Sequence, residues 1–205
     1  MHVYKKIETE YVKNNNKKLV ENLRISKLIK DSDDVLDFGC GRGIWNSNSQ
    51  NKDSFFHELY LYDINPENRK YCKEKYQNFI ILNNLEKNFK VDRILINSVI
   101  QYIKKEDLEK IFSKFHSMLK KDGIIIILDI PKNSRIIEFI LTCFTNFDLF
   151  KIQVEQIRNS KYRKTDYYIH SIKELISISE KYFDLTKIKN LDINTNRFGI
   201  ILKKL

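Results

Sequence analysis

The chain has 205 residues, of which 42% are hydrophobic and 31% charged, and its formal net charge is +10. No apolar run is long enough for a membrane-spanning helix, and residues 1–18 lack the apolar centre of a secretory signal. Three widely separated cysteines argue against a disulfide framework, and no Cys/His cluster has the spacing of a zinc site. We therefore expect a single cytoplasmic domain over residues 1–205, without a bound metal.

The excess of positive charge has two interpretations. A basic chain can bind nucleic acid, but Lys and Arg are spread along this whole sequence, as a general enrichment in Lys, Asn and Ile would also produce. The densest basic run is 158–164. In both cases an anionic substrate is attracted more readily than a cationic one.

The first half of the chain alternates between amphipathic helices and short apolar runs. A helix is expected over 19–28, and Asn65 is placed to cap a second helix that begins at Pro66 and ends near Tyr76. The apolar runs predict four strands, over 35–38, 58–62, 79–82 and 93–96.

The second half contains a third amphipathic helix and a fifth strand. The apolar face of this helix consists of Leu108, Ile111, Phe112, Phe115 and Leu119. Gly123 follows its end, where a left-handed cap is expected. The run over 124–130 is continuously apolar, as expected for a strand covered on both faces, and Pro131 closes it.

Residues 131–167 form the principal insertion, with an apolar first half and a basic second half. They could serve as a lid, as a substrate region or as a dimer contact, so that both a monomer and a homodimer remain open. The capping box Ser171–Glu174 then begins a helix that ends near Tyr182. Two strand-like segments over 185–191 and 198–202 complete the chain and predict a hairpin. The alternation indicates an α/β fold with a mostly parallel sheet.

A glycine-rich turn carries the strongest functional signal. The segment Asp37-Phe-Gly-Cys-Gly-Arg-Gly43 follows a buried strand and has glycines at alternate positions, which allow open backbone dihedrals and close approach of a ligand. The third glycine comes one residue earlier than in the dinucleotide-binding fingerprint. Asp63 ends the second strand, where a carboxylate can accept hydrogen bonds from ribose hydroxyls. This pattern indicates a nucleoside-containing cofactor that lies across the turn.

These residues resemble the class I methyltransferases over most of the chain. Residues 37–43 are similar to the first motif of that family, Asp/Glu-x-Gly-x-Gly-x-Gly, and Leu61-Tyr-Asp63 is similar to the second. The resemblance implies S-adenosylmethionine as cofactor and an α/β three-layer sandwich. Its seven-stranded, mostly parallel sheet would have the order 3-2-1-4-5-7-6, with strand 7 antiparallel.

The resemblance also implies the cofactor-binding residues. Asn84 stands where the family usually has an Asp that contacts the adenine amino group, and an amide oxygen could accept that bond. The complete expected set is Asp37, Gly39, Cys40, Gly41, Gly43, Trp45, Asp63, Ile64, Asn84, Leu85, Asn97 and Ser98.

Candidate catalytic residues are selected by their position, because ligands of open α/β sheets bind at the carboxyl ends of the strands. His170 precedes a helix start on that edge and is the expected general base; Tyr102 follows strand four and could line the acceptor pocket. Asp129, near the end of strand five, could contact substrate or hydrogen-bond a loop. His57 and His116 are expected on the opposite edge.

Three functions compete. The first is O-methylation of a small polar, anionic metabolite such as a sugar or a phosphorylated intermediate. The second is RNA methylation at ribose or base. The base-amino type is disfavoured because 97–100 reads Asn-Ser-Val-Ile, and the Cys-nucleophile type because no Cys closely follows strand four or five. The third is a non-catalytic S-adenosylmethionine-binding protein, against which the intact glycine motif argues.

Overall fold

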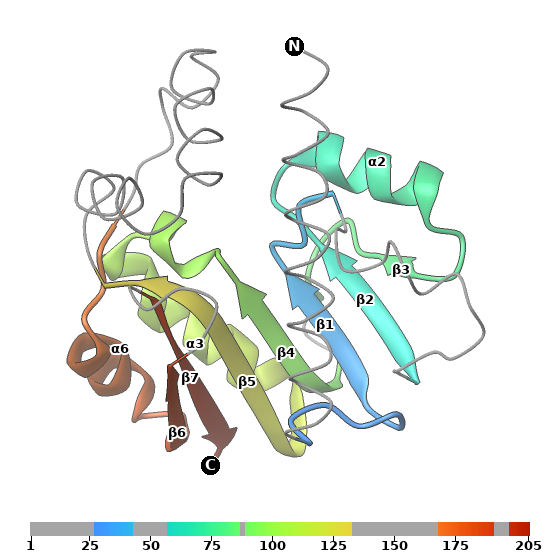
Figure 1. Cartoon of the computed structure of the whole chain (residues 1–205). Helices are drawn as coiled ribbons and strands as arrows, with labels where there is room; N and C mark the ends of the chain where they lie inside the picture. Colours follow the sequence, from blue (N-terminus) through green and yellow to red (C-terminus); the bar gives the residue numbers. More distant parts are fainter. Residues whose placement is uncertain (1–26, 43–56, 87–88, 133–167, 191–196) are drawn as a thin grey trace, which may run out of the picture.

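The computed structural model describes residues 27–42, 57–86, 89–132, 168–190 and 197–205. Within these ranges seven strands form one sheet in the order β3-β2-β1-β4-β5-β7-β6 (Figure 1). All neighbouring pairs from β3 to β5 are parallel, whereas β7 is antiparallel to both β5 and β6. The predicted strand order and the antiparallel β7 are confirmed. The strands are β1 (Asp34–Phe38), β2 (Glu58–Tyr62), β3 (Ile80–Ile81), β4 (Val91–Asn97), β5 (Leu119–Pro131), β6 (Phe183–Asn190) and β7 (Arg197–Lys204).

Helices α2 and α6 begin at the capping residues that the sequence predicts. Asn65 precedes α2 (Pro66–Lys75), and its side chain accepts a 2.9 Å hydrogen bond from the N–H of Glu67. Ser171 precedes α6 (Ile172–Ser179), and its hydroxyl accepts a 3.1 Å bond from the N–H of Glu174. A short 3-10 helix, η2 (Ile100–Tyr102), and α3 (Lys105–Met118) follow β4. No described helix is long and apolar enough to cross a membrane.

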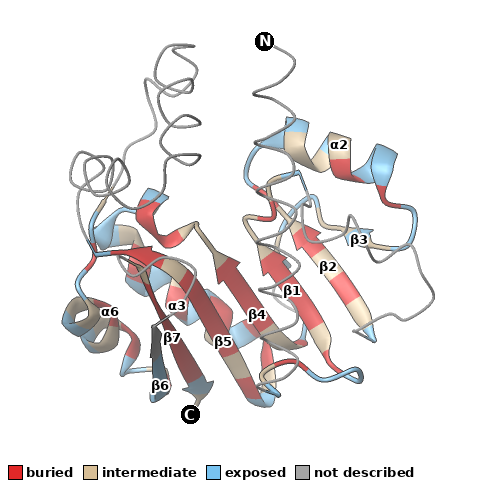
Figure 2. Cartoon of the chain, viewed as in Figure 1, coloured by how far each residue is buried: buried red, intermediate tan, exposed pale blue. Residues whose placement is uncertain are grey.

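The sheet separates two hydrophobic clusters, because successive residues of a strand point to opposite faces. Leu36 and Ile94 belong to the cluster that includes α3 and α6, whereas Val35 and Leu95 belong to the one that includes Cys72 of α2. The central strands are accordingly buried along most of their length (Figure 2). This double burial explains why their sequences are nearly continuous apolar runs.

The backbone between α3 and the buried part of β5 differs from the expectation. Asp122, with φ of +63°, takes the left-handed conformation that the sequence analysis placed at Gly123. A Cβ at Gly123 would lie 2.9 Å from Cδ2 of Leu119 and 3.0 Å from the carbonyl oxygen of Lys120. Glycine is therefore required there for close packing and not for its backbone freedom.

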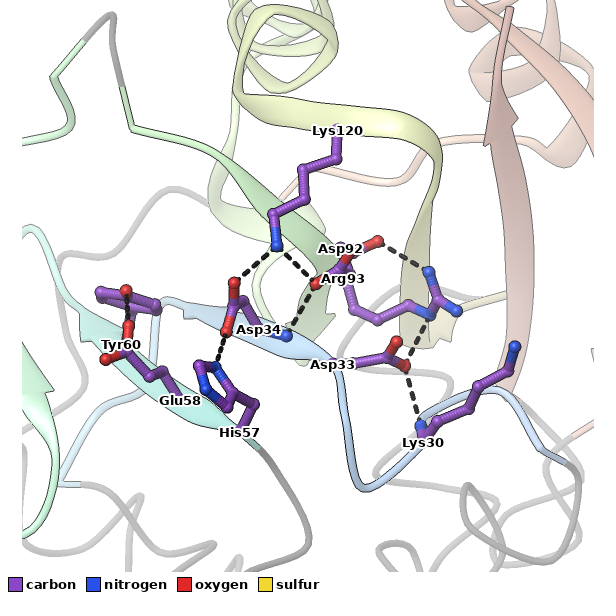
Figure 3. Close-up of polar contacts among 9 residues, drawn as sticks. All are labelled: Lys30, Asp33, Asp34, His57, Glu58, Tyr60, Asp92, Arg93 and Lys120. Carbon is purple, nitrogen blue, oxygen red and sulfur yellow. Dashed lines mark hydrogen bonds and ion pairs between the residues drawn. The ribbon is translucent and has the colours of Figure 1, made fainter.

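An ionic network joins the starts of three strands at the edge opposite the strands' carboxyl ends (Figure 3). Lys120 Nζ lies 2.6 Å from Oδ2 of Asp34 in β1 and 2.9 Å from Oδ2 of Asp92 in β4. His57, just before β2, lies with Nδ1 2.8 Å from Oδ1 of Asp34. His116, in the last turn of α3, packs against the rings of Tyr182 and Phe183. The expected placement of both histidines is confirmed.

Candidate active site

The glycine-rich turn follows β1 at the carboxyl edge of the sheet and is hydrogen-bonded to the end of β2. Gly39 and Gly41 have φ of +78° and +58°, a region that glycine enters without steric cost. The N–H groups of Gly39 and Cys40 both donate to the carbonyl oxygen of Tyr62, at 2.7 and 3.0 Å. The turn is therefore a defined loop that joins two strand ends.

The two glycines are needed for different reasons. A Cβ at Gly39 would overlap Cγ2 of Val99, which follows β4. The glycine turn therefore lies directly against the segment after β4. A Cβ at Gly41 would have no described atom within 4 Å, so among the described residues only its φ demands glycine and no atom fills the space beside it. This open space is where a ligand can approach the backbone.

Asp63 connects the glycine turn to the start of α2. Its Oδ2 accepts a 2.8 Å hydrogen bond from the N–H of Gly41, and its Oδ1 accepts one of the same length from the N–H of Asn65. Asp63 is 8% exposed as a residue, whereas the neighbouring Ile64 is 86% exposed. A carboxylate beside an exposed aliphatic side chain suits the ribose and the flat base of a nucleoside.

Asp37 is a buried acid below the turn. It is 2% exposed, and its Oδ2 has no hydrogen-bond partner among the described residues. Burial, with smaller contributions from Cys72 and Asp63, raises the pKa of Asp37 to about 8. An orphaned buried carboxyl oxygen is costly unless a ligand supplies a donor.

Cys40 and Cys72 are both buried free thiols that lie against the same backbone atom. Their Sγ atoms lie 3.6 and 3.5 Å from the carbonyl oxygen of Gly41. The hydrogen bond with Cys72, followed by burial, raises the pKa of the Cys40 thiol far above its ordinary value. Cys40 is thus an inert, space-filling thiol in the turn.

The remaining expected cofactor residues follow β3 and β4. Asn84 is exposed and Leu85 half-buried in the segment after β3. Asn97 ends β4, and Ser98 follows it with φ of +58°, which is rare for a residue other than glycine. Tyr102, at the end of η2, is 47% exposed on the same edge of the sheet. Gly43, Trp45, residues 19–26 of the predicted helix over 19–28 and nearly all of the 131–167 insertion, including 158–164, lie outside the described residues. The last two residues of that predicted helix, Lys27 and Leu28, are described and are not helical, and Lys27 has a φ of +55°.

His170 lies beside the segment after β4, as expected, but its ring is engaged. Its Nε2 is 2.9 Å from the carbonyl oxygen of Ile103, and its Nδ1 is 3.6 Å from Oε2 of Glu174. The residue is only 3% exposed. These contacts describe a buried side chain that links α6 to the segment after η2, with both ring nitrogens close to protein atoms among the described residues. The base role of His170 stays a prediction, and it requires one ring nitrogen to exchange its present contact for the substrate.

Two further polar residues lie on this edge, and no motif in the sequence indicates a role for either. Gln101 is buried in η2, and Arg197 begins β7 and donates to the backbone and carboxylate of Asp129. Gln101 lies in the segment after strand four without a residue-specific signal, and Arg197 reaches the edge because β7 runs antiparallel to β5. No local signal in the sequence could have identified either residue.

The described residues of the edge fit S-adenosylmethionine. Gly41 offers open space, Asp63 a carboxylate for ribose, and Asp37 an unpaired oxygen below the turn. No group of three His, Cys, Asp or Glu side chains in the described part could hold a metal ion. A family model described as a methyltransferase domain matches residues 9–182. The chain belongs to this methyltransferase family.

Solved structures agree with this assignment at the level of the fold. The methyltransferase is 15% identical to an S-adenosylmethionine-dependent methyltransferase from Clostridium acetobutylicum, with a TM-score of 0.61 over 92% of this chain and 90% of that one. It is 10% identical to the N-methyltransferase NodS from Bradyrhizobium japonicum in complex with S-adenosylhomocysteine, with a TM-score of 0.59 over 93% and 86% of the two chains. No curated protein matches the sequence.

A third structure shows how widely this fold is used. An O-methyltransferase family 2 protein from Planctomyces limnophilus, in complex with apigenin, is 17% identical, with a TM-score of 0.57 over 84% of this chain and 51% of that one. The fold is therefore shared by N- and O-methyltransferases, and it does not select the atom that is methylated. S-adenosylmethionine is the cofactor of this enzyme.

Proposed function

We propose that this methyltransferase transfers the methyl group of S-adenosylmethionine to an oxygen of a small polar, anionic metabolite, such as a sugar or a phosphorylated intermediate, in the cytoplasm. The observation that carries the proposal is the contact between Gly39 and Val99, which brings the cofactor turn against a polar edge. That edge includes Ser98, Asp129 and Arg197. The net charge of +10 favours the approach of an anion.

The proposed cofactor site uses the residues expected from the sequence. Asp37, Gly39, Cys40 and Gly41 would line the turn, and Asp63 would hold the ribose. Ile64, Asn84 and Leu85 would surround the adenine, and Asn97 and Ser98 the methionine part; Gly43 and Trp45 complete the proposal from the sequence alone. When bound, S-adenosylmethionine supplies an activated methyl group, so the protein chiefly positions the acceptor and removes its proton.

The test combines a binding measurement with a search for the acceptor. Calorimetry should show S-adenosylmethionine binding at micromolar concentration. Enzyme incubated with tritiated-methyl cofactor and an extract of the source cells should label the small-molecule fraction and leave the RNA fraction unlabelled. Label confined to RNA would overturn the proposed acceptor class, and absence of binding would overturn the enzymatic function as a whole.

RNA methylation is the second candidate, because the same net charge of +10 suits a polyanion. In that case labelling of RNA should fall steeply with salt, since binding would release counterions from the phosphates. Labelling of a small metabolite should depend much less on salt. A titration from low to physiological salt in the same assay separates these two functions.

A further inference from the structure

Two non-glycine residues with left-handed backbone lie side by side at the carboxyl edge of the sheet. Ser98 follows β4, Asp129 lies near the end of β5, and each has φ of +58°. β4 and β5 are paired in parallel up to Asn97 and Leu128, the residues just before them. Such backbone conformations cost free energy and are concentrated at functional sites.

The surrounding structure orients the Asp129 carboxylate. The Ser98 hydroxyl donates a hydrogen bond to its Oδ2, and Nη1 of Arg197 lies 3.4 Å from the same oxygen and 3.0 Å from the Asp129 carbonyl oxygen. The pairing of β5 with β7 shifts register between Ile127 and Ile130, so Asp129 lies in an irregularity of the ladder. Irregularities of this kind redirect side chains beside active sites.

The second carboxylate oxygen, Oδ1, has no hydrogen-bond partner among the described residues, and the side chain is 34% exposed. Gln101, in the short helix η2 after Ser98, also has an oxygen without a described partner. Its Nε2 donates to the carbonyl oxygen of Ser98 at 2.8 Å, while its buried Oε1 lacks a partner in the described structure. A ligand that donates hydrogen bonds can pair with both oxygens: the buried Oε1 of Gln101, which is costly to leave unpaired, and the partly exposed Oδ1 of Asp129, which such a ligand can reach.

We propose that Asp129 is a catalytic residue of this methyltransferase and that its Oδ1 accepts the proton of the acceptor hydroxyl that is methylated. This inference rests on the proposed function. The hydroxyl oxygen forms a bond to the methyl carbon while the methyl–sulfur bond breaks and its electron pair stays on sulfur. The hydroxyl proton passes to Oδ1, and Oδ2 remains hydrogen-bonded to Ser98.

The electrostatic surroundings of Asp129 are consistent with this role. Asp129 is partly buried, and this partial burial raises its pKa, while the charge of Arg197 and the hydrogen bond from Ser98 offset only part of the increase. Among the described residues, the charged group of β7 that faces the carboxylate is Arg197, and the group that faces it from the β4 side is the neutral Ser98 hydroxyl. A carboxylate with a raised pKa is a better proton acceptor than an ordinary one.

Asp122 provides a matched control at the opposite edge of the sheet. It also has left-handed backbone, with φ of +63°, and it is paired with a basic residue of β7, Lys203, at 2.9 Å. Asn tolerates this backbone conformation, so Asp→Asn adds little strain at either site. The variants Asp129→Asn and Asp122→Asn therefore differ in their distance from the proposed acceptor and not in the kind of change.

The experiment measures S-adenosylhomocysteine binding by calorimetry and tritium transfer to the small-molecule fraction of an extract of the source cells. Asp129→Asn should bind S-adenosylhomocysteine within about twofold of wild type but transfer about 100-fold more slowly or worse. Asp122→Asn should retain the wild-type rate. The wild-type rate should also fall as the pH is lowered and Asp129 takes up a proton, whereas the residual rate of Asp129→Asn should not show this fall.

Two results would overturn the inference while the proposed function stands: transfer by Asp129→Asn at the wild-type rate, or an equal loss in both variants. Failure of the wild-type protein to bind S-adenosylhomocysteine, or to label any small molecule, would instead overturn the proposed function, and this inference with it.

Discussion

The backbone N–H of Gly41 donates a 2.8 Å hydrogen bond to Oδ2 of Asp63, so that the glycine turn and the acid after β2 hold each other in place. Asp63→Ala removes an acceptor for two backbone donors, as well as the proposed ribose contact. Loss of hydrogen bonds to a charged group should weaken S-adenosylhomocysteine binding by about 1.5–3 kcal/mol, roughly 10- to 150-fold. Calorimetry on this variant and on Asp184→Ala, an exposed control on β6, tests the prediction. If Asp63→Ala bound S-adenosylhomocysteine as tightly as Asp184→Ala, Asp63 would not be a cofactor-binding residue.

Asp37→Asn should stabilise the free protein and weaken cofactor binding. The pKa of Asp37 is raised from 3.8 to about 8, first by burial. Between these values the folded state holds a proton that the unfolded state has lost, so the contribution of Asp37 to stability falls as pH rises. Asn does not ionise, so the variant's advantage in melting temperature should be larger at pH 8 than at pH 5. A gain in melting temperature that is the same at pH 5 and pH 8 would contradict the view that ionisation of Asp37 destabilises the wild-type protein.

Gly39→Ala and Gly41→Ala should differ in stability although they belong to the same turn. Both place a Cβ on left-handed backbone, at about 1–2 kcal/mol. Only Gly39→Ala also overlaps Val99, which adds about 1–3 kcal/mol. Urea unfolding should therefore rank Gly39→Ala as the less stable variant. Adding Val99→Ala should restore part of the stability of Gly39→Ala and none of that of Gly41→Ala; the absence of such rescue would argue against the overlap.

Lys120→Met should destabilise the protein by about 1 kcal/mol at pH 7, because this partly exposed ammonium joins the starts of β1 and β4. Burial acts to raise the pKa of Asp34, but hydrogen bonds from Lys120 and His57 outweigh it and lower the pKa. A lowered pKa contributes stability at neutral pH that is lost as pH falls and Asp34 is protonated. Urea unfolding at pH 7 and pH 3 should therefore show a smaller difference from wild type at pH 3 than at pH 7. Lys110→Met, which removes an exposed pair with Asp107, is the control and should have no effect.

His170→Ala should reduce stability more than turnover. The substitution leaves the Ile103 carbonyl without its 2.9 Å partner inside the protein, at a cost of about 1–3 kcal/mol. His170→Gln keeps an N–H donor of similar reach and should recover part of the loss. Thermal unfolding measures the stability of both variants, and tritium transfer measures their turnover. A large loss of turnover in a variant as stable as wild type would indicate that His170 takes part in catalysis.

Much of the fold follows from local features of the sequence. The Asn65 and Ser171 caps, the continuous apolar run of β5 and the alternate glycines of the turn each depend on residues close together in the chain. Propensity, periodicity and backbone stereochemistry act over this range, so these features could be predicted. The resemblance to class I methyltransferases supplied the strand order.

The acceptor side of the site depends instead on contacts between distant segments. Arg197 reaches Asp129 across 68 residues of sequence because β7 runs antiparallel to β5, and His170 reaches Ile103 across 67 residues. The sequence by itself determined the class of fold and the cofactor turn, since a single strand and its turn contain that information. Only the tertiary structure decided that His170 is buried against the Ile103 carbonyl group and that Oδ1 of Asp129 has no partner among the described residues, because burial and hydrogen-bond partners exist only after the strands have packed.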